Sequence, residues 1–118
     1  MRAMVERRQY ERIENIKFKA LVYGRPTGGG RNAYDIVNLS LGGVLIRCPE
    51  EFGANELVSV SLDCNEIGLE CAVVLKAIVV RAVPGKDGFN VALKFINTSR
   101  KDAAQLKRIL KFHKQQGS

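Results

Sequence analysis

Much of the chain consists of short segments in which apolar and polar residues alternate. In IKFKALVYG, which begins at Ile16, every second residue is apolar and Lys17 and Lys19 fall between them. Alternation of this kind places the apolar side chains on one face of an extended segment, so it predicts a half-buried strand. Alternation or a β-branched run predicts six strands in all, at about 16–24, 34–39, 42–48, 57–64, 69–83 and 88–96.

The breaks between these segments have the composition of turns. GRPTGGGRN, DCNEIG and VPGKDG supply Gly, Pro, Asn and Asp, residues that accept a positive φ or preset a bend. Short strands this closely spaced predict an all-β fold with one helix, a six-stranded antiparallel β-barrel. Alternating strand–helix units are lacking, which argues against a doubly wound sheet. The glycine-rich stretch lacks the Lys-Ser/Thr and the helix that follow a phosphate-binding loop, so it is interpreted as a hairpin tip.

The one strong helix is predicted at the C-terminal end, over residues 99–116. Ser99 can accept a hydrogen bond from a first-turn amide, and the carboxylate of Asp102 suits the positive end of the helix. An apolar-leaning stripe follows, made of Ala103, Leu106, Ile109, Leu110 and His113. This stripe is expected to cover one side of the barrel.

Residues 1–13 are polar, highly charged and without a clear period. They predict a flexible ligand-binding arm ahead of a single barrel domain over residues 14–118. The net charge of the chain is +7, and the basic residues gather at its two ends, in residues 1–31 and 94–118. Basic ends of this kind favour an anionic partner.

The composition disfavours several functional classes. No apolar run approaches the roughly 20 residues of a membrane span, and the charged N-terminus lacks an apolar leader, so we expect a cytoplasmic protein without membrane insertion. The three cysteines show no CxxC spacing and the single histidine, His113, is remote, so no metal ligands are assigned and reduced thiols are expected. No Ser–His–Asp set or pair of carboxylates can be placed, so no catalytic residues and no enzyme activity are predicted.

A polar motif, NLSLGG, begins at Asn38 between the second and third predicted strands. Asn38 and Ser40 are two residues apart, so in an extended segment their side chains share a face. Gly43 permits a positive φ or a close approach to the backbone. Asn, Ser and Gly are also ordinary turn formers. Combined with Arg8 and Arg12 of the arm, however, they describe a site for an anionic ligand with hydrogen-bonding edges, such as a nucleotide.

These motifs together resemble a PilZ domain. That family has an RxxxR motif on an N-terminal arm and a [D/N]xSxxG motif on a barrel, matched here by RQYER at residues 8–12 and NLSLGG at residues 38–43. The order and separation of the motifs also match, as do NVALKF in the last strand and the basic terminal helix. The resemblance implies a bacterial six-stranded barrel that binds the second messenger cyclic di-GMP.

The resemblance also implies roles for individual residues. Arg8 and Arg12 would clamp the ligand, because guanidinium pairs bidentately with guanine O6 and N7 and stacks on base planes. Asn38 would meet a guanine edge, in place of the aspartate often found there. Ser40 would add a hydrogen bond, and Gly43 would leave room for the ligand.

Two further arginines allow two interpretations each. An arginine at the place of Arg7 resembles family members that bind an intercalated ligand pair, so two cyclic di-GMP per protein are expected. The alternative is a solvated Arg7 or an ion pair with Glu11. Arg81 ends a long strand where family members often carry a residue that packs on a base. The alternative for Arg81 is a solvated charge at the end of a strand.

The expected function is that of a receptor or adaptor in second-messenger signalling. Ligand would order the arm across the barrel and change the surface shown to an unidentified effector protein. Two alternatives stay open: a basic barrel that binds single-stranded nucleic acid, and a PilZ-like interaction module that binds no ligand. The first needs exposed aromatic residues, and the sequence has no Trp and few Tyr and Phe. The intact arginine and NxSxxG motifs argue against the second.

Overall fold

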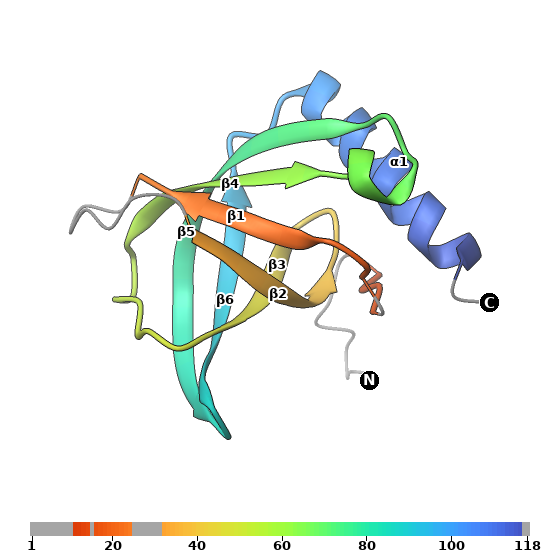
Figure 1. Ribbon diagram of the computed structural model, residues 1–118. Helices are drawn as coiled ribbons and strands as arrows, with labels where there is room; N and C mark the ends of the chain where they lie inside the picture. The colour runs from red at the N-terminus through yellow and green to blue at the C-terminus, as the bar shows by residue number, and fades with distance from the viewer. Residues whose placement is uncertain (1–10, 15, 25–31, 117–118) are drawn as a thin grey trace, which may run out of the picture.

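The structure is a computed structural model that describes residues 11–14, 16–24 and 32–116 (Figure 1). Six antiparallel strands form a closed barrel in the order β1-β2-β3-β6-β5-β4. The elements are β1 (Lys19–Tyr23), β2 (Asn32–Leu39), β3 (Gly43–Cys48), β4 (Leu57–Asp63), the 3₁₀ turn η1 (Asn65–Ile67), β5 (Ala72–Gly85), β6 (Gly88–Ile96) and α1 (Arg100–Gln116). The predicted six-stranded antiparallel barrel with one C-terminal helix is confirmed.

The interior of the barrel is filled by the inward half of each alternating strand. In β4, for example, Val58, Val60 and Leu62 are buried while the residues between them are not. Burying the apolar set drives the sheet to curl on itself, because closure hides these side chains and also pairs every strand edge. The core therefore sits inside the barrel, and the outward side chains are left to carry other functions.

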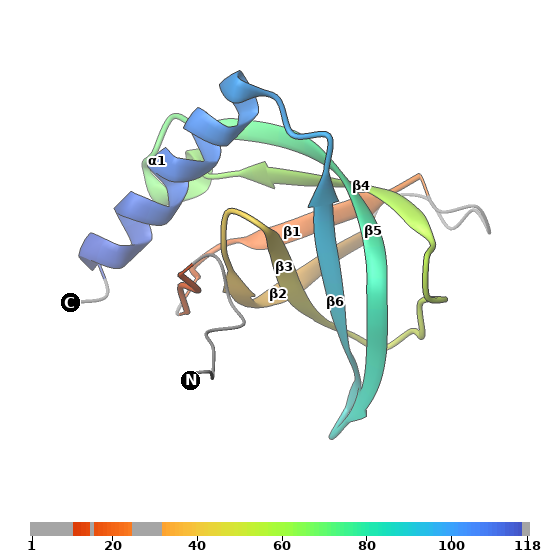
Figure 2. The ribbon, with the colours of Figure 1, turned by 180° about the vertical axis from the view of Figure 1, so that it is seen from behind.

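Two irregularities interrupt the alternation, one in β2 and one in β5. Ile36 pairs with Ile46 but Asn38 pairs with Leu45, so Val37 is an extra residue in β2. A second register shift lies between Val79 and Arg81 in β5. A bulge of this kind re-aims the side chains that follow it. Beyond the second bulge, the β5–β6 hairpin extends past the other strands (Figure 2).

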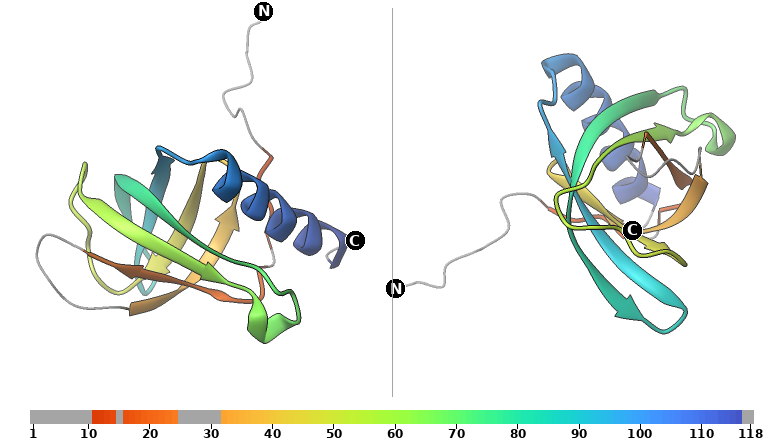
Figure 3. Two further views of the ribbon diagram at one scale, coloured as in Figure 1. Left: turned by 90° about the horizontal axis from the view of Figure 1, so that it is seen from above. Right: turned by 90° about the vertical axis from the view of Figure 1, so that its left-hand side faces the viewer.

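Helix α1 lies across one end of the barrel (Figure 3). It begins as the sequence predicts, with the Asp102 N–H donating to Ser99 Oγ at 3.0 Å. Leu106 and Ile109 are completely buried against the barrel. His113 is also buried, with its ring centroid 5.4 Å from that of Phe18. The helix thus closes the end of the barrel at which the β2–β3 turn lies. Within the part of the chain that the structure describes, no helix is long and apolar enough to span a membrane.

Candidate functional site

The end of the predicted arm is attached to the barrel through Ile13. The Ile13 N–H donates to the Leu39 carbonyl at 2.8 Å, and the Leu39 N–H donates back to the Ile13 carbonyl at 3.0 Å. Both side chains are buried. This reciprocal pair is an isolated antiparallel bridge, so it extends the sheet by one residue beside the end of β2. Ile13, the last residue of the predicted arm, is therefore held against the barrel. Arg12 is the residue directly before it in the chain.

Arg12 is brought to the NLSLGG motif by this bridge. An antiparallel register continued by one residue from Ile13–Leu39 sets Arg12 opposite Ser40. Because Ile13 and Leu39 face the core, the flanking side chains of Arg12 and Asn38 belong to the outer side. Arg12 is exposed and Asn38 is half-buried. The bridge therefore brings the segment that contains Arg12 to the NLSLGG motif, although the two are far apart in the sequence.

The bulge in β2 determines which way Asn38 faces. Ile36 is buried, so strict alternation from Ile36 would turn Asn38 inward as well. The extra residue at Val37 reverses the phase, and Asn38 then pairs with Leu45 on the outer face while Leu39 is buried. The bulge thus places an amide side chain outside the barrel at the point where the arm joins it.

Ser40 organises the β2–β3 turn. Its Oγ accepts hydrogen bonds from the N–H groups of Gly42 and Gly43, at 3.1 and 3.2 Å. The Ser40 N–H also donates to the Gly43 carbonyl at 2.9 Å. Ser40 is 9% exposed, and its hydroxyl forms its hydrogen bonds within the turn. The sequence left two roles open for Ser40, a ligand hydrogen bond and an ordinary turn former. These hydrogen bonds show the turn role, and the ligand contact stays a prediction.

Gly43 is required by the neighbouring strand. A Cβ built on Gly43 would lie 2.2 Å from the carbonyl oxygen of Leu93 in β6. The backbone of Gly43 does not have a positive φ, so close approach between strands, and not turn conformation, selects glycine here. The predicted role of Gly43 in leaving room for a ligand stays a prediction beside this structural one.

Arg81 lies in the same lateral row of the barrel as Asn38. Asn38 pairs with Leu45, Leu45 with Ala92, and Ala92 with Arg81. Directly paired residues share a face, so all four side chains point outward. Three strand spacings separate the ends of the row, about 14 Å. Arg81 is exposed and stands beside the bulge in β5.

The three predicted side chains at this face are unpaired within the described part of the chain. There, Arg12, Asn38 and Arg81 make no hydrogen bond or ion pair. Two more cations flank the row and were missed by sequence reasoning: Lys94, opposite Gly43, and Arg47 on β3. Their outward position follows from the parity of the strands, which could have identified them. We call this surface the arginine face; its described residues are Arg12, Asn38, Leu45, Arg47, Arg81, Ala92 and Lys94.

The remaining predicted arginines, Arg7 and Arg8, lie outside the described residues. Their contribution to the arginine face therefore stays a prediction. The part that is described already offers planar guanidinium groups and one amide around half-buried Leu45 and Ala92. Such a surface can pair with anionic oxygens and with the acceptor edge of a base, and it can also contact a flat ring.

The raised pKa values of two cysteines argue against a nucleophilic or metal-binding role for them. Burial raises the pKa of the Cys64 thiol to about 12, with smaller contributions from Cys71 and Asp63. Burial also raises the pKa of Cys71, against an opposing effect of Arg108. A thiol that stays protonated is a poor nucleophile and a poor metal ligand. Across residues 11–14, 16–24 and 32–116, no group of three or more His, Cys, Asp or Glu side chains could hold a metal ion.

Comparison with protein-family models gives a match over most of the chain. The family model described as "PilZ domain" matches residues 6–112. The chain therefore belongs to the PilZ domain family. No significant match was found among curated protein sequences.

Solved structures show the same fold. The PilZ domain of YcgR from Escherichia coli with c-di-GMP is 20% identical, with a TM-score of 0.71 and 95% of each chain covered. The inhibitor of motility MotI/DgrA of Bacillus subtilis is 15% identical with a TM-score of 0.75, and the MrkH–c-di-GMP complex of K. pneumonia is 17% identical with a TM-score of 0.70. The match covers 96% of this chain in both cases, but only 52% and 55% of those longer chains.

Proposed function

We propose that this chain is a receptor for cyclic di-GMP that works by presenting a changed surface to a partner protein in the bacterial cytoplasm. The observation that carries the proposal is the Ile13–Leu39 bridge, which joins the segment that contains Arg12 to the end of β2, next to the NLSLGG motif. Membership of the PilZ family supports it, as does c-di-GMP in the similar structures of YcgR and MrkH.

The chemistry of the ligand fits the arginine face. Cyclic di-GMP has two guanines, each with adjacent O6 and N7 acceptors, and a ring that carries two phosphodiester charges. Arg12 and Arg8 bind it as the main clamps, since a guanidinium satisfies a base edge or a phosphate bidentately. Asn38 meets a guanine edge, and Ser40 serves mainly by holding the turn in shape. Gly43 keeps β3 and β6 close enough to form one flat platform.

Two ligand molecules bind as an intercalated pair, with Arg7 supplying the additional cation. A second ligand brings two further negative charges and two further guanines, which the surface must match. Arg81, at the far end of the row from Asn38, lies where the second molecule can pack on it. Arg81 is exposed and makes no hydrogen bond or ion pair within the described residues, so it can turn toward the ligand without losing a partner.

Binding orders residues 1–12 on the barrel. Ordering costs roughly 1 kcal/mol or more per residue, and charge-assisted hydrogen bonds worth about 1.5–3 kcal/mol each offset that cost. The described part of the arm is already attached at Ile13. The partner protein then senses a face whose charge and shape have both changed.

Isothermal titration calorimetry with cyclic di-GMP tests the proposal. The expected result is saturable binding with a stoichiometry near two, and loss of most affinity in Arg12→Ala. Arg100→Ala, at an exposed arginine on α1 that is not one of the residues of the arginine face, is the matched control. Affinity of Arg12→Ala within about twofold of the parent would rule out the clamp, and a stoichiometry near one would rule out the pair.

A further inference from the structure

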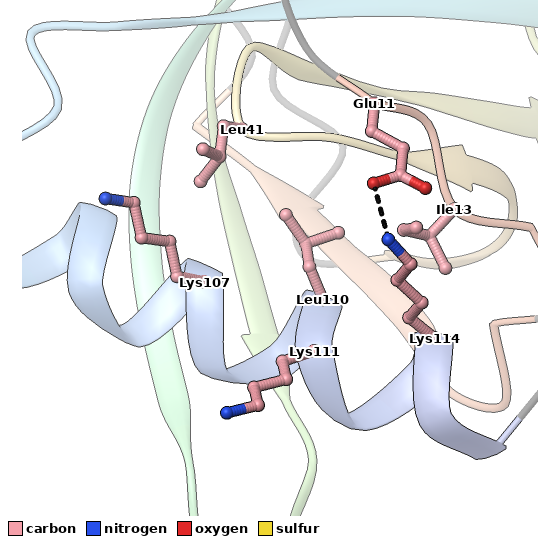
Figure 4. A pocket seen from close by; sticks show the side chains of 7 residues that line it. All are labelled: Glu11, Ile13, Leu41, Lys107, Leu110, Lys111 and Lys114. Carbon is pink, nitrogen blue, oxygen red and sulfur yellow. Dashed lines mark hydrogen bonds and ion pairs between the residues drawn. The ribbon is translucent and has the colours of Figure 1, made fainter.

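A groove with a volume of about 470 Å³ lies between α1 and the segments joined at the Ile13–Leu39 bridge (Figure 4). It is lined by Glu11, Ile13, Leu41, Lys107, Leu110, Lys111 and Lys114. Leu41 belongs to the NLSLGG turn, and Glu11 belongs to the arm. We call this cavity the lysine groove. It shares no residue with the arginine face, and four of its seven lining residues come from α1.

The floor of the lysine groove is aliphatic. Figure 4 shows Leu41 and Leu110 pointing toward each other from the turn and from α1, with Ile13 beside Leu110. Leu41 and Leu110 are only partly buried, at the edge of the core. An apolar surface of this kind gains free energy when a partner removes it from water.

The rim is cationic and regularly spaced. Lys107, Lys111 and Lys114 follow one another at helical intervals of four and three residues, so they share one side of α1. They extend over about 10 Å of the axis, or two turns. Lys107 and Lys111 are exposed and make no hydrogen bond or ion pair with the described residues. They are therefore available to an acidic partner.

One carboxylate of the chain itself, that of Glu11, already pairs with a lysine of the groove. Glu11 Oε1 lies 3.1 Å from Lys114 Nζ, and both side chains are about 62% exposed. An ion pair this exposed is weak, so a partner carboxylate can replace Glu11 at little cost. One end of the groove thus already holds the group that we expect a partner to supply.

We propose that the lysine groove binds an acidic amphipathic helix of a partner protein. Apolar side chains of that helix would pack on Ile13, Leu41 and Leu110, and its Asp and Glu side chains would pair with the lysines. A nucleotide fits less well, because the described lining has no arginine fork and no aromatic ring for a base. No lining residue of the groove belongs to the arginine face, so this proposal does not rest on cyclic di-GMP binding.

Titration of ¹⁵N-labelled protein with a designed peptide of about 16 residues tests it. The peptide carries leucines at i, i+3, i+4 and i+7 and glutamates elsewhere. The expected result is chemical-shift change confined to residues around the groove, with binding at least about tenfold weaker for a scrambled peptide of equal composition. Equal binding of both peptides, or shifts centred outside the groove, would overturn the proposal, as would tighter binding of a version with lysine in place of glutamate.

Variants locate the site and separate it from the arginine face. Lys107→Glu/Lys111→Glu should weaken peptide binding about tenfold or more. Lys101→Glu, an exposed lysine on the same helix that does not line the groove, should leave it unchanged. Leu110→Gln removes the apolar contact and should also weaken binding. If the double variant binds the peptide as well as the parent does while its barrel resonances are unchanged, the proposal fails, whatever cyclic di-GMP does.

Discussion

The arginine face and the lysine groove are both cationic, yet they differ in every other respect. The face is an outward row across four strands, with guanidinium groups around an amide. The groove is a cleft beside a helix, with ammonium groups above aliphatic side chains. Arginine presents a planar fork that matches bases and phosphates, whereas lysine is a compact point charge. The difference teaches that a positive net charge favours anionic partners in general. The side chains around each cation then determine which kind of anion the region suits.

The two regions share one structural support, the β2–β3 turn, so the largest effect should come from Gly43→Ala. A Cβ there meets the Leu93 carbonyl oxygen at 2.2 Å, and forcing β3 away from β6 should cost about 3 kcal/mol or more of unfolding free energy. Urea denaturation measures it. Gly53→Ala is the control, because nothing lies within 4 Å of a Cβ at Gly53. Equal stability of the two variants would show that β3 and β6 tolerate the side chain.

A reciprocal pair of substitutions tests whether the two regions are distinct. Arg12→Ala should lower the affinity for cyclic di-GMP by about tenfold to a hundredfold, through loss of a charge-assisted contact worth about 1.5–3 kcal/mol. It should leave the affinity for the acidic peptide nearly unchanged. Lys107→Glu/Lys111→Glu should show the opposite pattern. Calorimetry gives the affinity of each variant for each ligand. If both variants lost affinity for both ligands, the two regions would be one site.

Ser40→Ala should have a moderate effect on the shared turn. Removing the hydroxyl leaves the partly buried N–H groups of Gly42 and Gly43 without this acceptor, at a cost of about 1–2 kcal/mol in unfolding free energy. Ser61→Ala, a half-buried serine on β4, is the control and should change stability little. Thermal denaturation compares them. A large loss of ligand affinity at unchanged stability would instead favour the predicted direct contact of Ser40 with ligand.

The smallest effect concerns the buried thiol of Cys64. The pKa of Cys64 is raised from 9.0 to about 12 in the folded protein. The folded state therefore retains a proton that the unfolded chain loses above pH 9. The contribution of Cys64 to stability is complete below pH 9 and declines as the pH rises toward 12. Between pH 8 and 10, the unfolding free energy of the parent should fall more steeply with pH than that of Cys64→Ala. The difference between the two slopes should stay well under ~1.4 kcal/mol per pH unit, which is the limit for the release of one proton. Equal slopes in urea denaturation would contradict the assigned burial.

The sequence predicted the fold well because its signals are local. Alternation in β4 and β6 and the Ser99 cap of α1 each lie within one segment, and each is confirmed. The bulges at Val37 and before Arg81 were not predicted, because a bulge depends on the register between two strands. They decide that Asn38 and Arg81 face outward, so the orientation of the site needed the structure.

The motifs of the candidate site were predicted by resemblance, but several physical roles were not. The ligand roles of Gly43 and Ser40 stay predictions. The turn role of Ser40 was among the alternatives that the sequence left open, whereas the close approach of Gly43 to Leu93 in β6 was not predicted. The lysine groove was also missed. Its lining comes from the arm, the β2–β3 turn and α1, and a contact among three segments far apart in sequence leaves no periodic signal in any one of them.

The attachment of Ile13 to Leu39 affects how readily the arginines of the arm reach the barrel. A wholly unattached arm would have to bring its arginines to the barrel by diffusion of a long tether. With Ile13 fixed, Arg8 lies five residues from an anchored point, within a contour length of about 17 Å. Its effective concentration at Asn38 is then set by that short tether, in the millimolar range typical of short linkers. In the proposed receptor, the attachment shortens the segment that has to order around the ligand, so less loop-closure entropy is lost on binding.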